Sequence, residues 1–265
     1  MHMRKSRVLE KLRAGKTVHS FKLNYSDPRI AETVALHGFD CIWLCQEHIG
    51  NDWSAIESQI RAAKCHDVDV LLRVSRGSYC DYAKPLEMDA TGIMVPHVMS
   101  LEDAENIVRM TRFQPVGRRP VDGANADAAF LNVPLSDYIV EANRERFVVV
   151  QIEDYEPLDQ LDEIAALDGI DMLFYGPADF SHSIGAPGDW NHPRVLEARK
   201  LVVEAAKKHG KFAGTTSEIS TVRKYVDMGY QFLNVGADVV AVNEYCKGLI
   251  GEFDRICSAN NRQTT

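Results

Sequence analysis

Two carboxylates stand just beyond two apolar runs in the middle of the chain. Glu153, preceded by Gln151, follows the run 147–150, and Asp179 follows the run 170–175. Both runs read as buried strands, and the amphipathic stretch between them reads as a helix. Such a unit returns the chain to a neighbouring parallel strand, so both carboxylates should lie at the same rim. Adjacent carboxylates repel unless a cation or a proton lies between them, and a hard divalent ion suits oxygen ligands. We therefore predict a divalent-metal site.

The motif that ends in Asp179 begins with small residues. Gly176, Pro177 and Ala178 would let the backbone approach a ligand closely, and the amides that follow could bind a carboxylate. A plain strand-to-helix turn with Asp179 as the helix cap is the alternative. Together with the carboxylate after the preceding strand, the motif favours a site for a small acid.

Other side chains suited to chemistry lie at or just beyond predicted strand ends. His48 follows the second strand and could act as a general base, and a solvated structural histidine is the alternative. Arg73 ends an apolar strand, which predicts either an internal salt bridge or a donor fork for a substrate oxyanion. The role of His97 stays open. His182 is more consistent with an exposed loop residue than with a metal ligand.

Covalent catalysis by lysine is not favoured, because no lysine ends the strands that carry the carboxylates. Lys22, near the end of the first predicted strand, is the one candidate, and no neighbouring feature clearly lowers its pKa. The segment 234–238 could offer a phosphate site beyond the last strand. Its single glycine and its acid instead favour helix capping by Asp238.

Apolar runs and amphipathic stretches alternate along the chain. Strands are predicted at 18–23, 39–45, 69–74, 92–95, 147–152, 170–175, 211–215 and 231–235. Helices are predicted at 4–15, 27–37, 54–65, 79–88, 101–111, 135–144, 158–167, 194–209, 217–228 and 239–252. This alternation predicts an α/β fold, most simply a closed (β/α)8 TIM barrel. An open doubly wound sheet is the alternative, weakened because no GxGxxG motif follows the first strand.

Two connections stand out by length. The segment 113–134 is rich in Arg, Gly, Pro, Asn and Asp and is expected to be a functional lid or an interface loop. A second polar loop is predicted at 181–192. No linker divides the chain, so residues 1–265 are expected to form a single domain that ends in a polar tail at 258–265.

Composition narrows the class of protein. The net charge of −8 and the absence of a basic cluster argue against a general nucleic-acid partner. No apolar run approaches a membrane span, and the first 16 residues have no secretory core. The six cysteines form no CxxC pair, which favours reduced, buried thiols. We expect a cytoplasmic enzyme that acts on small molecules, with no membrane partner.

With these motifs in view, the chain resembles the HpcH/HpaI family of class II, metal-dependent aldolases. Its members include 4-hydroxy-2-oxoheptanedioate and 2-dehydro-3-deoxyglucarate aldolases, within the phosphoenolpyruvate/pyruvate barrel superfamily. The resemblance covers about residues 6–253. Its most specific parts are Glu47-His48, Arg73, and the segments 92–96, 111–119, 151–153 and 176–179.

The resemblance implies roles for individual residues. The positions of Glu153 and Asp179 hold Mg²⁺, Mn²⁺ or Co²⁺ in that family. The histidine at the position of His48 is the general base, and the arginine at the position of Arg73 steadies the developing enolate. These roles imply a carbon–carbon lyase that releases an aldehyde and leaves pyruvate.

The resemblance also implies a substrate seat and an assembly. Gln151 and the backbone from Gly176 to Asp179 would seat the pyruvate moiety. The superfamily implies a swapped C-terminal helix and a homo-oligomer, a trimer or a hexamer of paired trimers. Glu87 matches an acidic position that reaches a neighbouring subunit's active site.

The chain departs from the family pattern at several positions. Cys45-Gln46 stands where relatives carry an Asp-containing pair that orients the catalytic histidine, so another carboxylate could replace the lost one. Lys22 falls near a position where some relatives carry a pocket aromatic. The loop 120–129 carries acids and amides in place of a more basic pattern. Substrate choice is therefore expected to differ from that of the named members.

Three functions are compatible with these residues. The first is a metal-dependent aldolase that cleaves or forms 4-hydroxy-2-oxo acids through a pyruvate enolate. The second is an oxaloacetate decarboxylase or related 2-oxo-acid lyase that uses the same residues. The third is a catalytically weak barrel that binds a 2-oxo acid without turning it over. Cys45 is the residue that would indicate this function.

Overall fold

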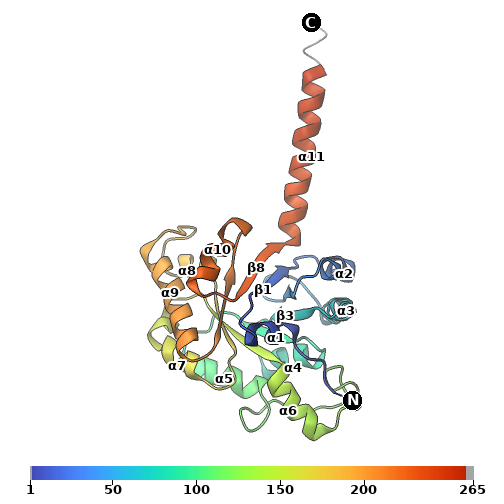
Figure 1. Cartoon of the computed structure of the whole chain (residues 1–265), viewed down its shortest axis with the longest axis vertical. Helices are drawn as coiled ribbons and strands as arrows, with labels where there is room; N and C mark the ends of the chain where they lie inside the picture. The colour runs from blue at the N-terminus through green and yellow to red at the C-terminus, as the bar shows by residue number, and fades with distance from the viewer. Residues whose placement is uncertain (1, 261–265) are drawn as a thin grey trace.

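The computed structural model describes residues 2–260 and contains a closed barrel of parallel strands in chain order (Figure 1). The strands are β1 (Val18–Lys22), β2 (Cys41–Cys45), β3 (Asp69–Arg73), β4 (Gly92–Val95), β5 (Phe147–Ile152), β6 (Met172–Tyr175), β7 (Phe212–Thr216) and β8 (Phe232–Ala237). Strand β8 pairs with β1 through Phe232 and Val18, so every strand has two neighbours. The predicted (β/α)8 barrel is confirmed, and the open doubly wound sheet is wrong.

Helices surround the barrel. They are α1 (Arg7–Arg13), α2 (Pro28–Leu36), α3 (Trp53–Lys64), α4 (Tyr79–Glu87), α5 (Leu101–Thr111), α6 (Leu135–Glu145), η1 (Glu156–Gln160), α7 (Leu161–Ala166), α8 (Pro177–Ser183), α9 (Pro193–Lys208), η2 (Ile219–Thr221), α10 (Val222–Met228) and α11 (Asp238–Asn260). Several helices begin where the sequence places a polar cap. The side chains of Ser6, Asp27, Asp52 and Ser100 accept hydrogen bonds from first-turn amides of α1, α2, α3 and α5.

Four predicted segments are wrong in detail. The motif 176–179 does not form a plain turn capped by Asp179, because Gly176 is the N-cap and α8 continues to Ser183. The polar loop expected at 181–192 therefore begins later. The helix expected at 217–228 is divided into η2 and α10. Helix α11 runs well beyond residue 252 and takes in the first residues of the expected tail, while 261–265 lie outside the described residues.

The barrel interior is filled by alternate strand residues. One buried cluster combines Val18, Cys41, Trp43, Leu71, Met94, Phe147, Val149, Met172, Phe174 and Phe232 with Val8, Leu9 and Leu12 of α1. Helix α1 therefore closes the amino end of the barrel with apolar side chains. Burial of each such side chain stabilises the fold by roughly 1.5–3 kcal/mol. The polar positions that continue these inward-facing rows lie at the opposite, carboxyl end.

Charged side chains are buried at the amino end, around the segments that lead into β4 and β5. The Arg146 guanidinium donates to Asp127 Oδ1 at 2.6 Å and to Asp89 Oδ1 at 2.8 Å, and it also donates to the Arg4 carbonyl at 3.0 Å. Burial alone would lower the pKa of Arg146, but Asp127 and Asp89 raise it. Each of the three Arg146 guanidinium nitrogens thus donates a hydrogen bond at this end of the barrel.

Helix α11 stands away from the barrel (Figure 1). Its 23 residues would span about 35 Å at the usual helical rise. Large apolar side chains along it are exposed, among them Tyr245, Leu249, Ile250 and Phe253. Within the described residues, no helix is both long enough and apolar enough to cross a bilayer. The swapped C-terminal helix stays a prediction.

The cysteines and the long connection complete the fold. All six cysteines are free thiols, but the prediction that they are buried is wrong for four of them. The exposed ones are Cys65, Cys80, Cys246 and Cys257. The segment 113–134 contains neither helix nor strand and packs through Phe113 against Tyr138. Its expected role as a lid or an interface loop stays a prediction.

Candidate active site at the carboxyl end of the barrel

The carboxyl ends of four strands, β1, β2, β3 and β5, bring polar side chains to one rim. Lys22 ends β1, Cys45 ends β2 and Arg73 ends β3. Gln151 is the second-to-last residue of β5, and Glu153 follows that strand directly. Parallel strands place their carboxyl ends at one face, which is where barrel enzymes carry their chemistry.

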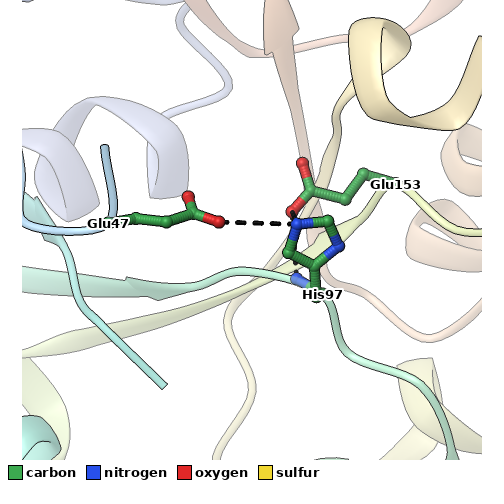
Figure 2. Close-up of side chains that lie close together, drawn as sticks. All are labelled: Glu47, His97 and Glu153. Atoms are coloured by element: carbon green, nitrogen blue, oxygen red, sulfur yellow. Dashed lines mark hydrogen bonds and ion pairs between the residues drawn. The ribbon is translucent and has the colours of Figure 1, made fainter. Parts of the chain in front are cut away.

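At the same rim, Glu153 and two residues from neighbouring segments form a compact cluster of potential metal ligands. One ligand atom each from Glu47, His97 and Glu153 lies within 4.8 Å of the others (Figure 2). His97 Nε2 lies 3.4 Å from Glu47 Oε1 and 3.9 Å from Glu153 Oε1. The three side chains come from the segments after β2, β4 and β5, which lie at one rim because strands β2 to β5 pair side by side in chain order.

His97 is held in an unusual backbone conformation. Its φ of 48° lies in the left-handed region, which costs a residue other than glycine about 1–3 kcal/mol. Its ring Nδ1 lies 2.8 Å from Asp154 Oδ2, and its backbone N–H donates to Glu153 Oε1 at 2.9 Å. Burial lowers the pKa of His97, but Asp154 and Glu153 raise it more. The strain and the paired carboxylate fix the ring beside the cluster.

Glu153 is the most deeply buried acid of the site and is fully shielded from solvent. Besides the His97 amide, the Gln151 side-chain amide donates to its Oε2 atom. Burial raises the pKa of Glu153 to about 7, and the charges of Asp179 and Glu47 add to this effect against the opposing effect of His97. Asp179 is near enough for its charge to act on Glu153, but it is not one of the three residues whose ligand atoms lie within 4.8 Å of one another, and its predicted role as a metal ligand stays a prediction.

Gly176 fits against Glu153 because it has no side chain. A Cβ atom at Gly176 would lie 2.5 Å from Glu153 Oε2 and 2.9 Å from Gln151 Nε2. Its own N–H donates to the Ile152 carbonyl at 3.1 Å, which ties the start of α8 to the end of β5. The side chains of Glu153 and Gln151 therefore lie close to the backbone at Gly176, and the expected approach of this backbone to a ligand stays a prediction.

Arg73 is buried and points into the barrel interior. Its Nε lies 2.9 Å from Glu47 Oε2, and its Nη2 donates to Cys45 Sγ at 3.2 Å. The Nε–Glu47 contact is an ion pair without hydrogen-bond alignment, so both atoms remain without a hydrogen-bond partner. The guanidinium carbon lies 5.1 Å from the centre of the Trp43 ring. The internal salt bridge, one of the two alternatives predicted for Arg73, is present. The Nε atom of Arg73 still has no hydrogen-bond acceptor among the described residues.

His48 and Lys22 are placed differently from their sequence-based descriptions. The His48 side chain is 54% exposed, and its Nε2 lies 3.6 Å from Glu47 Oε2. The carboxylate nearest the predicted base is therefore that of its neighbour in sequence. Lys22 was expected to have an ordinary pKa, but burial and the charge of Arg73 lower it. His182 is exposed on α8, as expected.

The cluster fits a divalent cation on the evidence of its own atoms. Glu47 Oε2 and Gln151 Oε1 are buried oxygens that have no hydrogen-bond partner among the described residues. Orphaned buried oxygens are costly, and a cation satisfies them. Carboxylates and carbonyl oxygens suit Mg²⁺ or Mn²⁺, and an imidazole nitrogen widens the choice to later transition metals such as Co²⁺.

Sequence reasoning missed part of this cluster. Glu47 entered only as part of a resemblance motif, the role of His97 was left open, and Asp154 was not singled out. One signal was available: His97 and Asp154 each lie just beyond a predicted strand, as Glu153 does. The sequence did not say which of these strand-end groups would face one another.

Comparisons with known proteins show the family to which this chain belongs. The family described as HpcH/HpaI aldolase/citrate lyase matches residues 21–244. A hydroxypyruvate/pyruvate aldolase from Pseudomonas aeruginosa is 33% identical over 94% of this chain and 92% of its own length. A 5-keto-4-deoxy-D-glucarate aldolase from Enterobacter sp. (strain 638) is 32% identical over 87% of this chain and 90% of its own. The crystal structure of an HpcH/HpaI aldolase from Desulfitobacterium hafniense DCB-2 superposes with a TM-score of 0.87, at 30% identity over 92% of this chain and 95% of that one.

Proposed function

Because the chain belongs to the HpcH/HpaI aldolase/citrate lyase family, we propose that it is a divalent-metal-dependent aldolase that cleaves or forms 4-hydroxy-2-oxo acids. Pyruvate would be the 2-oxo acid released, together with an aldehyde. The observation that carries this proposal is the buried Glu153 carboxylate, which offers a ligand atom within 4.8 Å of ligand atoms of Glu47 and His97. The relatives named as hydroxypyruvate/pyruvate and 5-keto-4-deoxy-D-glucarate aldolases support the same class of substrate.

The metal ligands proposed are Glu153 and Asp179. Glu47 and His97 complete the anionic pocket around Glu153, with ligand atoms close enough to take part. A bound Mg²⁺, Mn²⁺ or Co²⁺ would polarise the 2-oxo group and offset negative charge that develops on its oxygen. Glu153 and Asp179 would bind and orient the ion, and neither would transfer a proton.

The substrate seat lies between β3, β5 and α8. Gln151 has a buried carbonyl oxygen without a hydrogen-bond partner. At the start of α8, Gly176 uses its N–H on β5 and Pro177 has none, so Ala178 and Asp179 supply the first amides for a substrate carboxylate. Across the barrel, the Arg73 guanidinium is positioned to stabilise the enolate oxygen.

Proton transfer is assigned to His48. Its ring is open to the rim, where a substrate hydroxyl can reach it, and Glu47 lies beside it. Removal of the proton from the 4-hydroxyl lets the C3–C4 bond break, which releases the aldehyde. Glu47 thus takes the place of the carboxylate that Cys45 cannot supply. His97, backed by Asp154, is assigned to hold Glu47 and Glu153 in position.

The assembly proposed is a homo-oligomer of at least two copies. Helix α11 presents exposed apolar side chains with no other part of the described chain packed along its outer length (Figure 1). A second copy would cover them, as the swapped helix implies. In a trimer or hexamer, Glu87 would reach a neighbouring active site. Analytical ultracentrifugation of the full chain and of Leu249→Glu tests this assembly.

The experiment for the main proposal is pyruvate release from 4-hydroxy-2-oxo acids, with and without EDTA, followed by addition of Mg²⁺, Mn²⁺ or Co²⁺. Activity should disappear in chelator and return with the metal. Full activity in chelator contradicts the metal role. Faster release from oxaloacetate than from any hydroxy-oxo acid would identify a decarboxylase instead, and binding without turnover would identify the weak 2-oxo-acid-binding barrel.

A further inference from the structure

Lys22 brings a half-buried amine to the rim of the barrel. It ends β1 and lies in register with Trp43 of β2, whose side chain is part of the cluster that fills the barrel interior. Among the described residues, the Lys22 Nζ atom makes neither a hydrogen bond nor an ion pair, and it lies 5.3 Å from the centre of the Trp43 ring. A carboxylate partner would favour the charged ammonium form, so the lack of one favours the neutral, nucleophilic amine.

The two acids near Lys22 are engaged with other groups. Asp238 accepts hydrogen bonds from backbone N–H groups at 2.7–2.9 Å. Glu47 lies against the buried guanidinium of Arg73, whose Nε is 2.9 Å from Glu47 Oε2. Neither acid is a hydrogen-bond or ion-pair partner of Lys22 in the described part of the chain, so neither holds its ammonium form in place.

The charges around Lys22 act on its protonation. Burial lowers the pKa of Lys22, and the positive charge of Arg73 lowers it further. Nearby acidic groups oppose this effect without cancelling it, namely Cys45, Glu47 and Asp238. The Arg73 guanidinium lies 5.1 Å from the centre of the same Trp43 ring that Lys22 contacts. A lysine that is withdrawn from water beside a second cation is one of the arrangements that activate amine nucleophiles in enzymes.

Arg73 offers a place for the carboxylate of a 2-oxo acid beside this amine. Among the described residues, its side chain donates one hydrogen bond, from Nη2 to Cys45 Sγ at 3.2 Å, and its buried Nε has no hydrogen-bond acceptor. A guanidinium with free donors is suited to carboxylates. In a 2-oxo acid the carboxylate adjoins the carbonyl carbon. An acid held by Arg73 therefore presents that carbon near the Trp43 ring, where the Lys22 amine also lies.

We propose that Lys22 is a nucleophile that forms an imine with the carbonyl group of pyruvate and related 2-oxo acids, which gives the site a second activity that needs no metal. The inference rests on the proposed function for the identity of the acid, and not for the metal. The same amine was the one lysine that the sequence offered for covalent chemistry, and its surroundings in the barrel supply the activation that the sequence did not reveal.

The reaction balances with water and protons alone. The neutral amine of Lys22 attacks C2 of pyruvate, the carbonyl oxygen takes up protons and leaves as water, and a protonated imine remains. Its positive nitrogen draws electrons from a C3–H bond, so that proton passes to water and an enamine forms. A solvent proton then returns to C3, and water hydrolyses the imine to pyruvate and free Lys22. The net result is exchange of the C3 hydrogens with solvent.

This exchange is separate from carbon–carbon cleavage. It requires no proton transfer from a 4-hydroxyl group, which is the step assigned to His48. Cleavage of the C3–C4 bond therefore continues to depend on His48 and on the metal seat, and the imine adds an activity without replacing the aldol reaction.

The first test traps the imine in the full-length protein with EDTA present. Pyruvate and cyanoborohydride would be added, and mass spectrometry of the intact chain and of its peptides would locate the reduced adduct. One adduct per chain should form on Lys22. Lys22→Arg keeps the positive charge but has no amine that can lose its proton, so the adduct should be lost. No adduct on Lys22 in the wild type overturns the proposal.

Lys84→Met is the matched control. Lys84 is also a half-buried lysine over an indole, with its Nζ 4.8 Å from the Trp53 ring centre, but it lies on α4 outside the barrel. This variant should form the Lys22 adduct as the wild type does. If the wild type forms adducts on Lys84 as readily as on Lys22, the surroundings of Lys22 give it no special reactivity and the proposal is overturned.

The second test measures the activity itself. In D₂O with EDTA, nuclear magnetic resonance would follow the replacement of the methyl hydrogens of pyruvate by deuterium. The wild type should exchange them faster than buffer does, and both Lys22→Arg and Lys22→Met should lose this acceleration. Wild-type exchange at the rate of buffer overturns the proposal, as does exchange that both variants retain.

The imine and the proposed aldolase function can fail separately. If the adduct forms on Lys22 but no pyruvate is released from 4-hydroxy-2-oxo acids with Mn²⁺, the aldolase proposal fails and the role of Lys22 stands. If pyruvate is released with Mn²⁺ but no adduct forms on Lys22, the imine is overturned and the aldolase stands.

Discussion

At the amino end of the barrel, the buried Arg146 donates to Asp127 and Asp89. At the carboxyl end, the buried Arg73 leaves Nε without a hydrogen bond, although Glu47 lies 2.9 Å away. Both ends bury arginine among acids, so residue type does not distinguish them. What differs is the arginine itself: every Arg146 guanidinium nitrogen donates a hydrogen bond, whereas Arg73 Nε donates none.

That difference separates two uses of buried charge. A fully partnered network fixes one arrangement, and its members have nothing left to offer a ligand. At the carboxyl end, buried atoms of Glu47, Arg73 and Gln151 lack hydrogen bonds, His97 has a left-handed backbone, and Glu153 is hard to ionise. Such costs persist in a fold where function requires them. The amino end thus stabilises the barrel, and the carboxyl end prepares it for a ligand.

The sharpest test of this contrast is Glu153→Gln. It removes the charge that the proposed ion requires and should lower kcat by about 10³-fold or more, the scale for losing a group aimed at developing charge. Pyruvate release measures the effect. Glu145→Gln is the matched change at the amino end, where Glu145 accepts from the Ser6 amide at 3.2 Å, and it should leave kcat intact. An equal loss of kcat in both variants would contradict the proposed difference between the two ends of the barrel.

His48→Asn should lower kcat by about 10²–10⁴-fold, the usual range for loss of a general base. Binding of 2-oxo acids should remain, because His48 has no part in the substrate seat. Steady-state kinetics and calorimetry measure the two quantities. A kcat close to wild type would remove His48 from the mechanism and direct attention to His97.

Arg146→Met should destabilise the fold by about 3–5 kcal/mol, because Asp127 and Asp89 would stay buried without their partner. The activity per folded molecule should hardly change. Urea unfolding gives the free energy of unfolding. Arg73→Met is the matched change at the other end, and it should show the reverse pattern, with a large loss of activity and a smaller loss of stability.

His97→Asn should weaken metal binding by about 10- to 100-fold, the effect usually seen when a group that orients metal ligands is removed. Titration with Mn²⁺, followed by electron paramagnetic resonance, measures the dissociation constant. His48→Asn serves as the control and should leave metal affinity unchanged. If His97→Asn spares metal affinity and abolishes turnover, His97 is the base.

The smallest effect expected is on pH-dependent stability of the metal-free protein. The pKa of Glu153 is raised from its ordinary 4.5 to about 7, so the folded state binds the proton more tightly than the unfolded state. Stability should therefore fall as pH rises from 4.5 to about 7. The raised pKa of His97 acts in the same direction. Thermal unfolding should show a fall of a few degrees, since about 1 kcal/mol shifts Tm by roughly 2–4 °C.

Two controls accompany the pH series. Glu153→Gln should flatten the dependence, because it cannot be protonated. Mn²⁺ should raise Tm at pH 8 more than at pH 5, since protons compete with the metal for the carboxylate. A Tm that rises with pH in this window would contradict the assignment of a raised pKa to Glu153.

Much of the fold could be predicted because it depends on local pattern. The apolar run before Gln151 is a strand in the structure as in the sequence, and strand β4 was predicted at the residues observed. The family, the barrel and the aldolase class are confirmed. Helix ends were less predictable. The start of α8 at Pro177 and the length of α11 depend on packing and on neighbours that sequence periodicity does not register.

The sequence by itself determined that acids follow consecutive strands, because strand and helix periods are written in nearby residues. Only the tertiary structure decided which strand-end groups meet. His97 and Glu153 are 56 positions apart, yet the His97 N–H donates to Glu153 Oε1 at 2.9 Å because β4 and β5, the strands they follow, pair side by side. Among the described residues Lys22 makes no ion pair: Glu47 lies against Arg73, and Asp238 accepts from the backbone N–H groups of Asn24, Tyr25 and Val239. Pairing of buried charges is a property of three-dimensional distance, and sequence spacing does not encode it.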